Sequence, residues 1–278
     1  MKLSIIIVNY NITQLLRNCL SSINRFVKDV DYEVIVIDNH SPDTSWRNLI
    51  SEFPQYTFLS SNKNEGFAKA NNKAIREAKG EFILLLNPDT EIEGHYLKEI
   101  IEFADFQSNF GCLGVRMHDA NGDFLPESKR SVPDMFNSFE KLFTNFSKNN
   151  SKSYYRNDVG EFNIAEVEVI TGAFFLCRKG VYETVGGLDE RYFMYGEDID
   201  LCYTLLNNRY ENWYYGKASI LHHKGECTVK NKVYLERFYG AMKIFIDKYY
   251  KKEHPLKHLI LSIGLKLKHQ LEKFKLKK

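Results

Sequence analysis

The sequence predicts an α/β protein with a mostly parallel central sheet flanked by helices. Short apolar runs rich in isoleucine, valine and leucine are typical of strands buried on both faces, and they lie at 3–8, 34–37 and 82–86. Between these runs lie segments with apolar residues near helical spacing. One, at 13–28, lies between the first and second runs, and two, at 44–53 and 67–79, lie between the second and third. Strands and helices that alternate in this way form parallel sheets with right-handed crossovers.

The composition is that of an ordinary globular protein, with 44% hydrophobic and 27% charged residues. A length of 278 residues fits one large domain or two small ones and excludes a small binding module. The formal net charge of +2 argues against a nucleic-acid-binding field over the whole surface. No apolar stretch approaches the roughly 18–20 residues that cross a bilayer. The five cysteines are widely spaced without a CxxC pair, so we expect no disulfide framework or zinc site and a cytoplasmic location.

Polar side chains follow each of the three predicted strands. Because ligands of such sheets bind beyond the carboxyl ends of the strands, these side chains are candidates for a binding site. The alternative is that they only form turns and helix caps, which is the usual role of such clusters. The turns contain Asn9, Tyr10 and Asn11 after the first strand, Asp38, Asn39 and Asp43 after the second, and Asn87, Pro88 and Asp89 after the third.

The pattern becomes less regular after residue 110. Residues 119–122 are typical of a hairpin turn, and 136–153 predict a loop or short helix. We expect further strands at 167–177, 210–215 and 219–222, a break at Gly186 and Gly187, and helices at 199–206 and 235–250.

Two motifs carry groups suited to metal binding and proton transfer. Asp89, beside a stiffening proline, is suited to hold Mg²⁺ or Mn²⁺ together with substrate phosphates, and His222 would complete the metal shell. A structural role is the commoner one for a histidine at a strand end. Glu197, Asp198 and Asp200 crowd the start of a predicted helix, which raises at least one pKa and suits a general base; helix capping is the alternative.

Two basic regions have their own interpretations. Arg130, next to Lys129, is suited to contact a phosphate or the acceptor, the alternative being a solvated surface charge.

The segment 251–278 contains nine lysines against Glu253 and Glu272, so it carries +7, and the preceding body of this +2 chain carries −5. Pro255 can begin a helix there. Its apolar residues recur every three or four positions, at 256, 259, 260, 263, 267, 271 and 274, which predicts a basic amphipathic helix. Such a helix lies on an anionic membrane surface, or packs against its own domain or a second subunit.

These motifs, in their order along the chain, resemble the family 2 glycosyltransferases from about residue 3 to 250. Within that family the sequence is most similar to the rhamnosyltransferase-like branch of bacterial surface-polysaccharide biosynthesis. The resemblance rests on the strand-end residues 6–11 and 36–39, on Ser41 and Asp43, on Asn62 to Phe67 with Asn71, and on Asn87 to Asp89, Gly172 to Phe174, Gly196 to Leu201 and His222.

The resemblance implies a GT-A fold and an inverting, metal-dependent glycosyl transfer. The donor would be a dTDP- or UDP-sugar, dTDP-rhamnose among them, and the acceptor a hydroxyl of a glycan or lipid-linked glycan. It implies a nucleotide-sugar half at 1–110 and an acceptor and catalytic half at 111–250. The tail helix would follow at 251–278 and bring this cytoplasmic enzyme to the inner face of the plasma membrane.

The resemblance also assigns roles to residues. Asp38 would accept the imide N–H of uracil or thymine, and Asp89 and His222 would hold Mg²⁺ or Mn²⁺. Asp198 would be the general base, with Glu197 beside it. The remaining donor contacts would be Asn9, Tyr10, Asn11, Asn39, Asp43, Asn62, Gly66, Phe67 and Asn71, and the acceptor or phosphate contacts Arg130, Gly172 and Asp200.

The sequence departs from the family pattern at two positions. Asn87 replaces the first acidic residue of the metal signature, and Cys227 stands where relatives often have serine. A catalytically inactive glycan-binding or scaffold protein of the same fold is the alternative function. A sugar-1-phosphate nucleotidyltransferase would need a glycine-rich phosphate loop after the first strand, which the residues after Val8 do not form.

Overall fold

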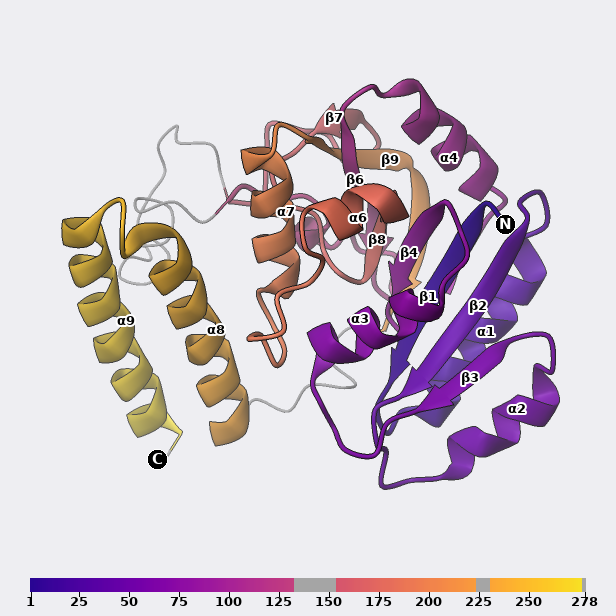
Figure 1. Ribbon diagram of the computed structural model, residues 1–278, viewed down its shortest axis with the longest axis horizontal. Coiled ribbons are helices and arrows are strands. Elements are labelled where there is room, and N and C mark those ends of the chain that lie inside the picture. The colour runs from indigo at the N-terminus through magenta and orange to yellow at the C-terminus, as the bar shows by residue number, and fades with distance from the viewer. Residues whose placement is uncertain (133–153, 224–230, 277–278) are drawn as a thin grey trace.

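The described residues form one mixed sheet of nine strands (Figure 1). This computed structural model describes residues 1–132, 154–223 and 231–276. The predicted loop or short helix at 136–153 lies wholly outside them, and so does Cys227. Along the sheet the strands follow the order β3-β2-β1-β4-β8-β6-β9-β5, and β7 pairs with β9.

The first four strands form the parallel part of the sheet. They are β1 (Leu3–Asn9), β2 (Tyr32–Asp38), β3 (Thr57–Ser60) and β4 (Phe82–Leu86). The three apolar runs are therefore confirmed as strands. The sequence did not predict β3, because this four-residue edge strand is only partly buried and lacks a continuous apolar run.

Beyond β4 the sheet becomes mixed, so the expected parallel arrangement holds only for its first half. The pairs β4 with β8, β6 with β8, β5 with β9 and β7 with β9 are antiparallel, whereas β6 and β9 run parallel. The strand expected at 167–177 is shorter, and those expected at 210–215 and 219–222 are one strand with a register shift. The bounds are β5 (Thr90–Ile92), β6 (Phe110–His118), β7 (Ile164–Glu166), β8 (Phe174–Arg178) and β9 (Glu211–His222).

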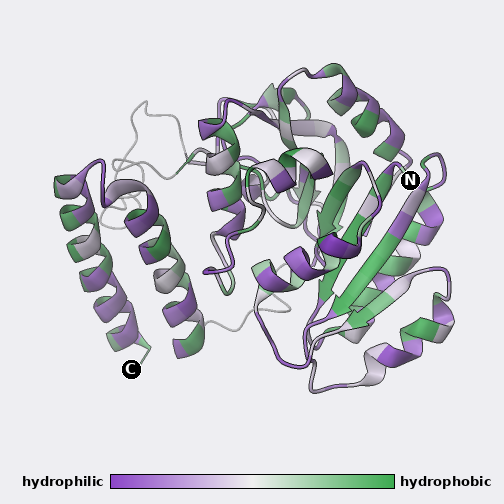
Figure 2. Ribbon diagram, viewed as in Figure 1, coloured by the Kyte–Doolittle hydropathy of each residue, from purple (hydrophilic) through white to green (hydrophobic). Residues whose placement is uncertain are grey.

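Helices cover both faces of the sheet. Alternate residues of β1 point to opposite faces, as Ile5 and Ile7 pack with α1, α2 and α4, and Ile6 and Val8 pack with α3, α6 and α7. Figure 2 shows the central strands as the most continuously hydrophobic part of the chain. These helices are α1 (Thr13–Phe26), α2 (Asn48–Glu52), α3 (Phe67–Glu77), α4 (Leu97–Phe106), α6 (Lys179–Thr184) and α7 (Glu197–Asn207), with short 3₁₀ turns at Ser45–Arg47 and Pro126–Ser128.

A helical hairpin of α8 (Lys232–Tyr250) and α9 (Pro255–Lys275) lies at one end of the molecule, with α7 between it and the sheet (Figure 1). It has a small core of its own, formed by Leu235, Tyr239, Ile246, Leu261 and Leu265. The tail is therefore helical as predicted, and one side of it packs on its own chain. In the part of the chain that the structure describes, no helix combines the length and hydropathy that a membrane span requires.

Candidate active site

Asp38 is the centre of a buried network at the carboxyl ends of β1 and β2. The parallel register pairs Asn9 with Asp38, and Asn9 Nδ2 donates to Asp38 Oδ1 at 2.8 Å. The next turn closes on the same carboxylate, since Ser41 donates its backbone N–H to Oδ2 at 3.0 Å and its hydroxyl to Oδ1 at 2.5 Å. Asn11 and His40 take left-handed backbone conformations that allow these tight turns. The strand ends therefore meet as predicted.

A second group of amides continues the site toward α3. Asn39 Nδ2 donates to Asn64 Oδ1 at 3.0 Å and to the Gly66 carbonyl at 3.2 Å. Gly66 has φ +87°, and a Cβ there would lie 2.4 Å from the Phe193 carbonyl oxygen, so only glycine fits. Phe67 N donates to the same carbonyl at 2.7 Å. The start of α3 is thus fixed against the loop that leads to α7.

The other predicted donor contacts differ in what they offer a ligand. Tyr10 is 47% exposed and Asn62 is exposed, so both present side chains to solvent. Asn71 is buried and its side chain donates to the Phe67 carbonyl, so it stabilises the first turn of α3 and is not presented to solvent. Hydrogen bonds from Ser45 lower the pKa of Asp43, which keeps that carboxylate ionised beside Thr13.

The turn after β4 brings Asp89 next to His222 at the end of β9. Antiparallel pairing of β5 with β9 places Thr90 opposite His222, and His222 Nε2 lies 3.5 Å from Asp89 Oδ1. Among the described residues, Asp89 Oδ1, Asn87 Oδ1 and His222 Nδ1 are buried without a hydrogen-bond partner. Buried oxygens without partners are costly unless a ligand completes them, and a divalent cation would do so. No group of three or more His, Cys, Asp or Glu side chains suited to a metal occurs within the described ranges.

Asp198 lies in the first turn of α7, and three donors hold its carboxylate. Its Oδ2 accepts Arg130 Nη2 at 2.7 Å and the Gly172 N–H at 3.3 Å, and its Oδ1 accepts the Ile199 N–H at 2.8 Å. Burial would lower the pKa of Arg130, but the Asp198 carboxylate offsets this and the pKa is raised. Arg130 is 8% exposed, so the alternative of a solvated surface charge is wrong. It contacts the predicted base instead of presenting a free guanidinium to phosphate.

The segment Gly172-Ala173 connects the Asp89 turn with Asp198. Asn87 N donates to the Ala173 carbonyl at 3.0 Å, while Gly172 donates to Asp198. A Cβ on Gly172 would lie 3.7 Å from both the Asp198 Cβ and a ring carbon of Phe67. The predicted metal turn, donor pocket and base therefore surround one short backbone segment.

Glu197 is the second carboxylate of this site and differs from Asp198 in its hydrogen bonding. It is 7% exposed, and its Oε2 has no hydrogen-bond partner in the described parts of the chain. Burial, and then repulsion from Asp198, raise the pKa of Glu197 to about 8. At neutral pH Glu197 is therefore mainly protonated.

We predict that Glu197 makes stability fall as pH rises from about 4.5 to 8. The folded protein holds this proton more tightly than the unfolded chain, so the contribution is complete below the ordinary glutamate pKa and is lost as pH rises through about 8. The slope is at most about 1.4 kcal/mol per pH unit. Urea unfolding at several pH values should show the slope reduced in Glu197→Gln. The exposed Glu183→Gln is the control, and an equal reduction there would contradict the assignment.

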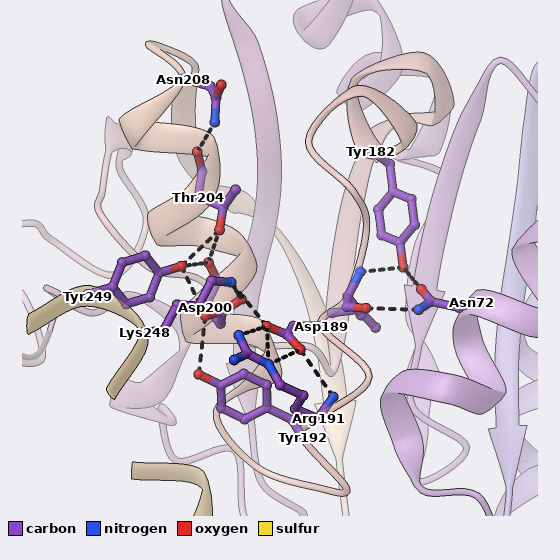
Figure 3. Close-up of polar contacts among 11 residues, drawn as sticks. Asn72, Tyr182, Asp189, Arg191, Tyr192, Asp200, Thr204, Asn208, Lys248 and Tyr249 are labelled. Carbon is purple, nitrogen blue, oxygen red and sulfur yellow. Dashed lines mark hydrogen bonds and ion pairs between the residues drawn. The ribbon is translucent and has the colours of Figure 1, made fainter. Parts of the chain in front are cut away.

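Asp200 does not contact the acceptor side, and our expectation of an acceptor or phosphate contact is wrong. Its side chain is 2% exposed, and both oxygens are engaged (Figure 3). Lys248 Nζ donates to Oδ2 at 2.7 Å, and the hydroxyls of Tyr192 and Tyr249 donate to Oδ1 at 3.1 and 3.0 Å. Asp200 therefore attaches α8 to the first turn of α7, two residues from Asp198.

Replacing Lys248 by methionine is expected to destabilise the fold by roughly 1–3 kcal/mol, because it leaves the buried Asp200 without its positive partner. The partial exposure of Lys248, 27% of its side chain, keeps the effect below that of a fully buried pair. Lys243→Met is the matched control on α8, since this 65% exposed lysine pairs with Asp247 on the surface and should change stability by less than about 0.5 kcal/mol. Urea midpoints would test both, and equal losses would contradict the role of Lys248.

Sequence reasoning missed several residues of this neighbourhood. Asn64 orients Asn39, and its place in the motif between Asn62 and Gly66 was the available signal. Lys248 and Tyr249 gave no local signal, because they lie 48 and 49 residues from Asp200 and meet it only through packing of α8 on α7. The same holds for the contact between Arg130 and Asp198, which spans 68 residues.

Comparisons with known proteins identify the family and the fold of this chain. Residues 4–186 match the family model "Glycosyl transferase family 2". An N-acetylglucosaminyl-diphospho-decaprenol L-rhamnosyltransferase of Mycobacterium tuberculosis is 27% identical over 239 residues, covering 81% of this chain and 77% of that protein. The structure of Staphylococcus aureus TarS 1–349 with UDP-GlcNAc matches with a TM-score of 0.57 at 21% identity, over 95% of this chain and 72% of that one. The mannosyltransferase PcManGT of Pyrobaculum calidifontis with GDP-Man and Mn²⁺ matches with a TM-score of 0.61 at 15% identity, over 94% and 68%.

Proposed function

Because the chain belongs to glycosyl transferase family 2 and has the GT-A fold of a rhamnosyltransferase-like glycosyltransferase, we propose that it transfers a sugar with inversion from a nucleoside diphosphate donor to a lipid-linked glycan. The donor is a dTDP- or UDP-sugar, with dTDP-rhamnose as the first to test. The relative from Mycobacterium tuberculosis supports this choice, since its name gives both a rhamnosyl group and a diphospho-lipid acceptor. The reaction is a step in the synthesis of a bacterial surface polysaccharide.

The observation that carries this proposal is the meeting of three parts at Gly172-Ala173. The donor pocket reaches it through Phe67, the Asp89 turn through Asn87, and the base through Asp198. A transferase of this class needs a departing diphosphate on one side of the sugar and a proton acceptor on the other. We assign residues 1–110 to the nucleotide sugar, and 111–250 to the acceptor and catalysis.

On the donor side, the residues bind and orient the nucleotide. Asp38 is fixed by Asn9 and Ser41, so its carboxylate is in place to accept the imide N–H of uracil or thymine. Tyr10 offers its exposed side chain to the nucleotide. Asp89 and His222 would hold Mg²⁺ or Mn²⁺, which supplies Lewis-acid stabilisation of the negative charge on the departing diphosphate.

On the acceptor side, Asp198 accepts the proton of the attacking hydroxyl. Arg130 and Gly172 orient one carboxylate oxygen, and this fixed position keeps the carboxylate ready for the reaction. Glu197, mainly protonated at neutral pH, cannot take this proton, so we assign that role to Asp198. No covalent nucleophile is needed when the hydroxyl displaces the diphosphate in one step with inversion.

A panel of nucleotide sugars tests this function. The protein is mixed with dTDP-rhamnose, UDP-glucose, UDP-GlcNAc or GDP-mannose, with Mg²⁺ or Mn²⁺, and with a lipid diphosphate-linked N-acetylglucosamine. We expect a thermal shift with the pyrimidine donors and release of nucleoside diphosphate only when the acceptor is present. A folded protein that no donor stabilises and that releases no diphosphate would contradict the proposal and favour an inactive scaffold.

A further inference from the structure

Helix α9 has apolar residues on two opposite sides. Leu261 and Leu265 are 6% and 5% exposed and pack against α8. The other side remains in contact with solvent over the length of the helix. It consists of Leu256, Leu259, Ile260, Ile263, Leu267 and Leu271, which are between 50% and 76% exposed and are called the outer stripe below.

The outer stripe is continuous along the helix. Its members follow one another at intervals of one, three or four residues, which places them on one side of an α-helix. At about 100° per residue, the stripe lies roughly opposite the side that contains Leu261 and Leu265. The packing of α9 on α8 therefore cannot bury it, and a stripe of this length on a monomer surface indicates an interaction site.

Lysines border the outer stripe on both sides. Helical geometry places Lys257, Lys268 and Lys275 about a quarter turn from the stripe in one direction, and Lys266 and Lys273 about a quarter turn in the other. The segment 251–278 as a whole carries +7, while the preceding body carries −5. The segment that contains the outer stripe thus carries the excess of positive charge in this protein.

We propose that the outer stripe docks on an anionic lipid bilayer, with α9 lying in the plane of the interface. The apolar side chains would enter the acyl boundary while the bordering lysines reach anionic headgroups, which is how basic amphipathic helices bind membranes. A second copy of the chain fits less well, because stripes packed face to face would bring the bordering lysines of both copies together. The same lysines that would repel one another in such a dimer are attracted to an anionic lipid surface.

The hairpin is fixed next to the candidate active site. Arg237 of α8 stacks 4.2 Å from the Phe193 ring centre, and Tyr234 contacts Tyr195 edge-on at 5.3 Å between ring centres. Phe193 and Tyr195 belong to the loop that leads into α7, which contains Asp198, and Lys248 attaches the far part of α8 to Asp200. Docking through α9 would therefore orient the site relative to the bilayer. Only this consequence rests on the proposed function, since it assumes a lipid-linked acceptor.

Sedimentation with vesicles tests the docking without any substrate. The full chain is mixed with vesicles of phosphatidylcholine alone or with phosphatidylglycerol. A stripe variant combines Ile260→Gln, Ile263→Gln and Leu267→Gln, which are solvent-facing changes. The matched control combines Ile50→Gln, Phe106→Gln and Phe162→Gln, which removes three exposed apolar side chains elsewhere, with exposures of 45%, 87% and 62%. Circular dichroism verifies that both variants are folded.

We expect the protein to bind vesicles that contain phosphatidylglycerol and to bind them less in high salt. The stripe variant should lose on the order of 10²-fold in partition coefficient, and the control should stay within about twofold. Replacing Lys257 and Lys266 by glutamine should weaken binding to anionic vesicles by about fivefold per lysine and leave neutral vesicles unaffected. Lys28→Gln with Lys98→Gln is the charge-matched control.

Two kinds of result would overturn the proposal. One is absence of vesicle binding by the folded protein, or equal loss in the stripe variant and its control. The other is a dimer by light scattering that the stripe variant converts to a monomer, with no vesicle binding, which would assign the stripe to a second copy. Because vesicle binding needs no donor, failure here leaves the proposed function intact, and a silent donor panel leaves the docking intact.

Discussion

Asp198→Asn should lower turnover by about 10²–10⁴-fold while donor affinity stays within about twofold of the parent. Asparagine keeps the size of the side chain but cannot take a proton at neutral pH, so the attacking hydroxyl loses its general base. The donor pocket built on Asp38 and Asn39 does not include Asp198, which is why binding is expected to survive. Diphosphate release and isothermal titration with the donor measure the two quantities.

Asp200→Asn is the matched control for this experiment. It changes a carboxylate to an amide on the same helix, two residues away, but Asp200 faces Lys248 and α8. We expect it to reduce stability and to keep turnover within about tenfold of the parent. Equal loss of donor binding and turnover in Asp198→Asn, or equal loss of turnover in both variants, would show that Asp198 is not the base.

Asp89→Ala should lower turnover by on the order of 10²–10³-fold, because it removes the charged protein oxygen nearest His222. The same variant should abolish the thermal shift that Mn²⁺ gives in the presence of a nucleoside diphosphate. This second readout does not depend on activity and separates cation binding from catalysis. Chelation of the cation should reduce turnover of the parent to a similar level.

Asn87→Asp tests the same cation site in the opposite direction from Asp89→Ala, by adding a carboxylate. Asn87 Oδ1 is buried without a partner in the described chain, two residues from Asp89. A carboxylate there would add charge where relatives have the first acid of the metal signature, so Mn²⁺ should bind more tightly. A thermal shift that neither substitution changes would show that the cation does not bind at this turn.

Much of the fold follows from local patterns. The apolar runs of β1, β2 and β4 and the helical spacing of α1, α3 and α7 are properties of single segments, and the structure confirms them. The strands β3, β5, β6 and β7 and the helices α4 and α6 were missed. Of these, β5 has only three residues and forms by pairing with β9, far away in the chain, so no periodicity reveals it.

Local patterns also predicted one part of the candidate site and failed to predict another. Strand-end chemistry placed Asn9 and Asp38 together, because parallel strands end at one edge and their register is set by the apolar pattern. The alternative for Arg130 as a solvated charge was wrong, since its burial depends on the β-bridge between Arg130 and Val169, 39 positions later. The roles assigned to Asp198, Asp89 and His222 remain predictions for the experiments above.

The sequence by itself determined the α/β layering, the family and the set of carboxylates and amides that follow the strands, because these depend on spacing along the chain. Only the tertiary structure decided what each carboxylate of α7 does. Asp198 meets Arg130 from 68 residues away, Asp200 is neutralised by Lys248 from 48 residues away, and Glu197 Oε2 has no hydrogen-bond partner among the described residues. Burial and long-range ion pairing set the charge of a carboxylate, and neither can be predicted from the residues next to it in the sequence.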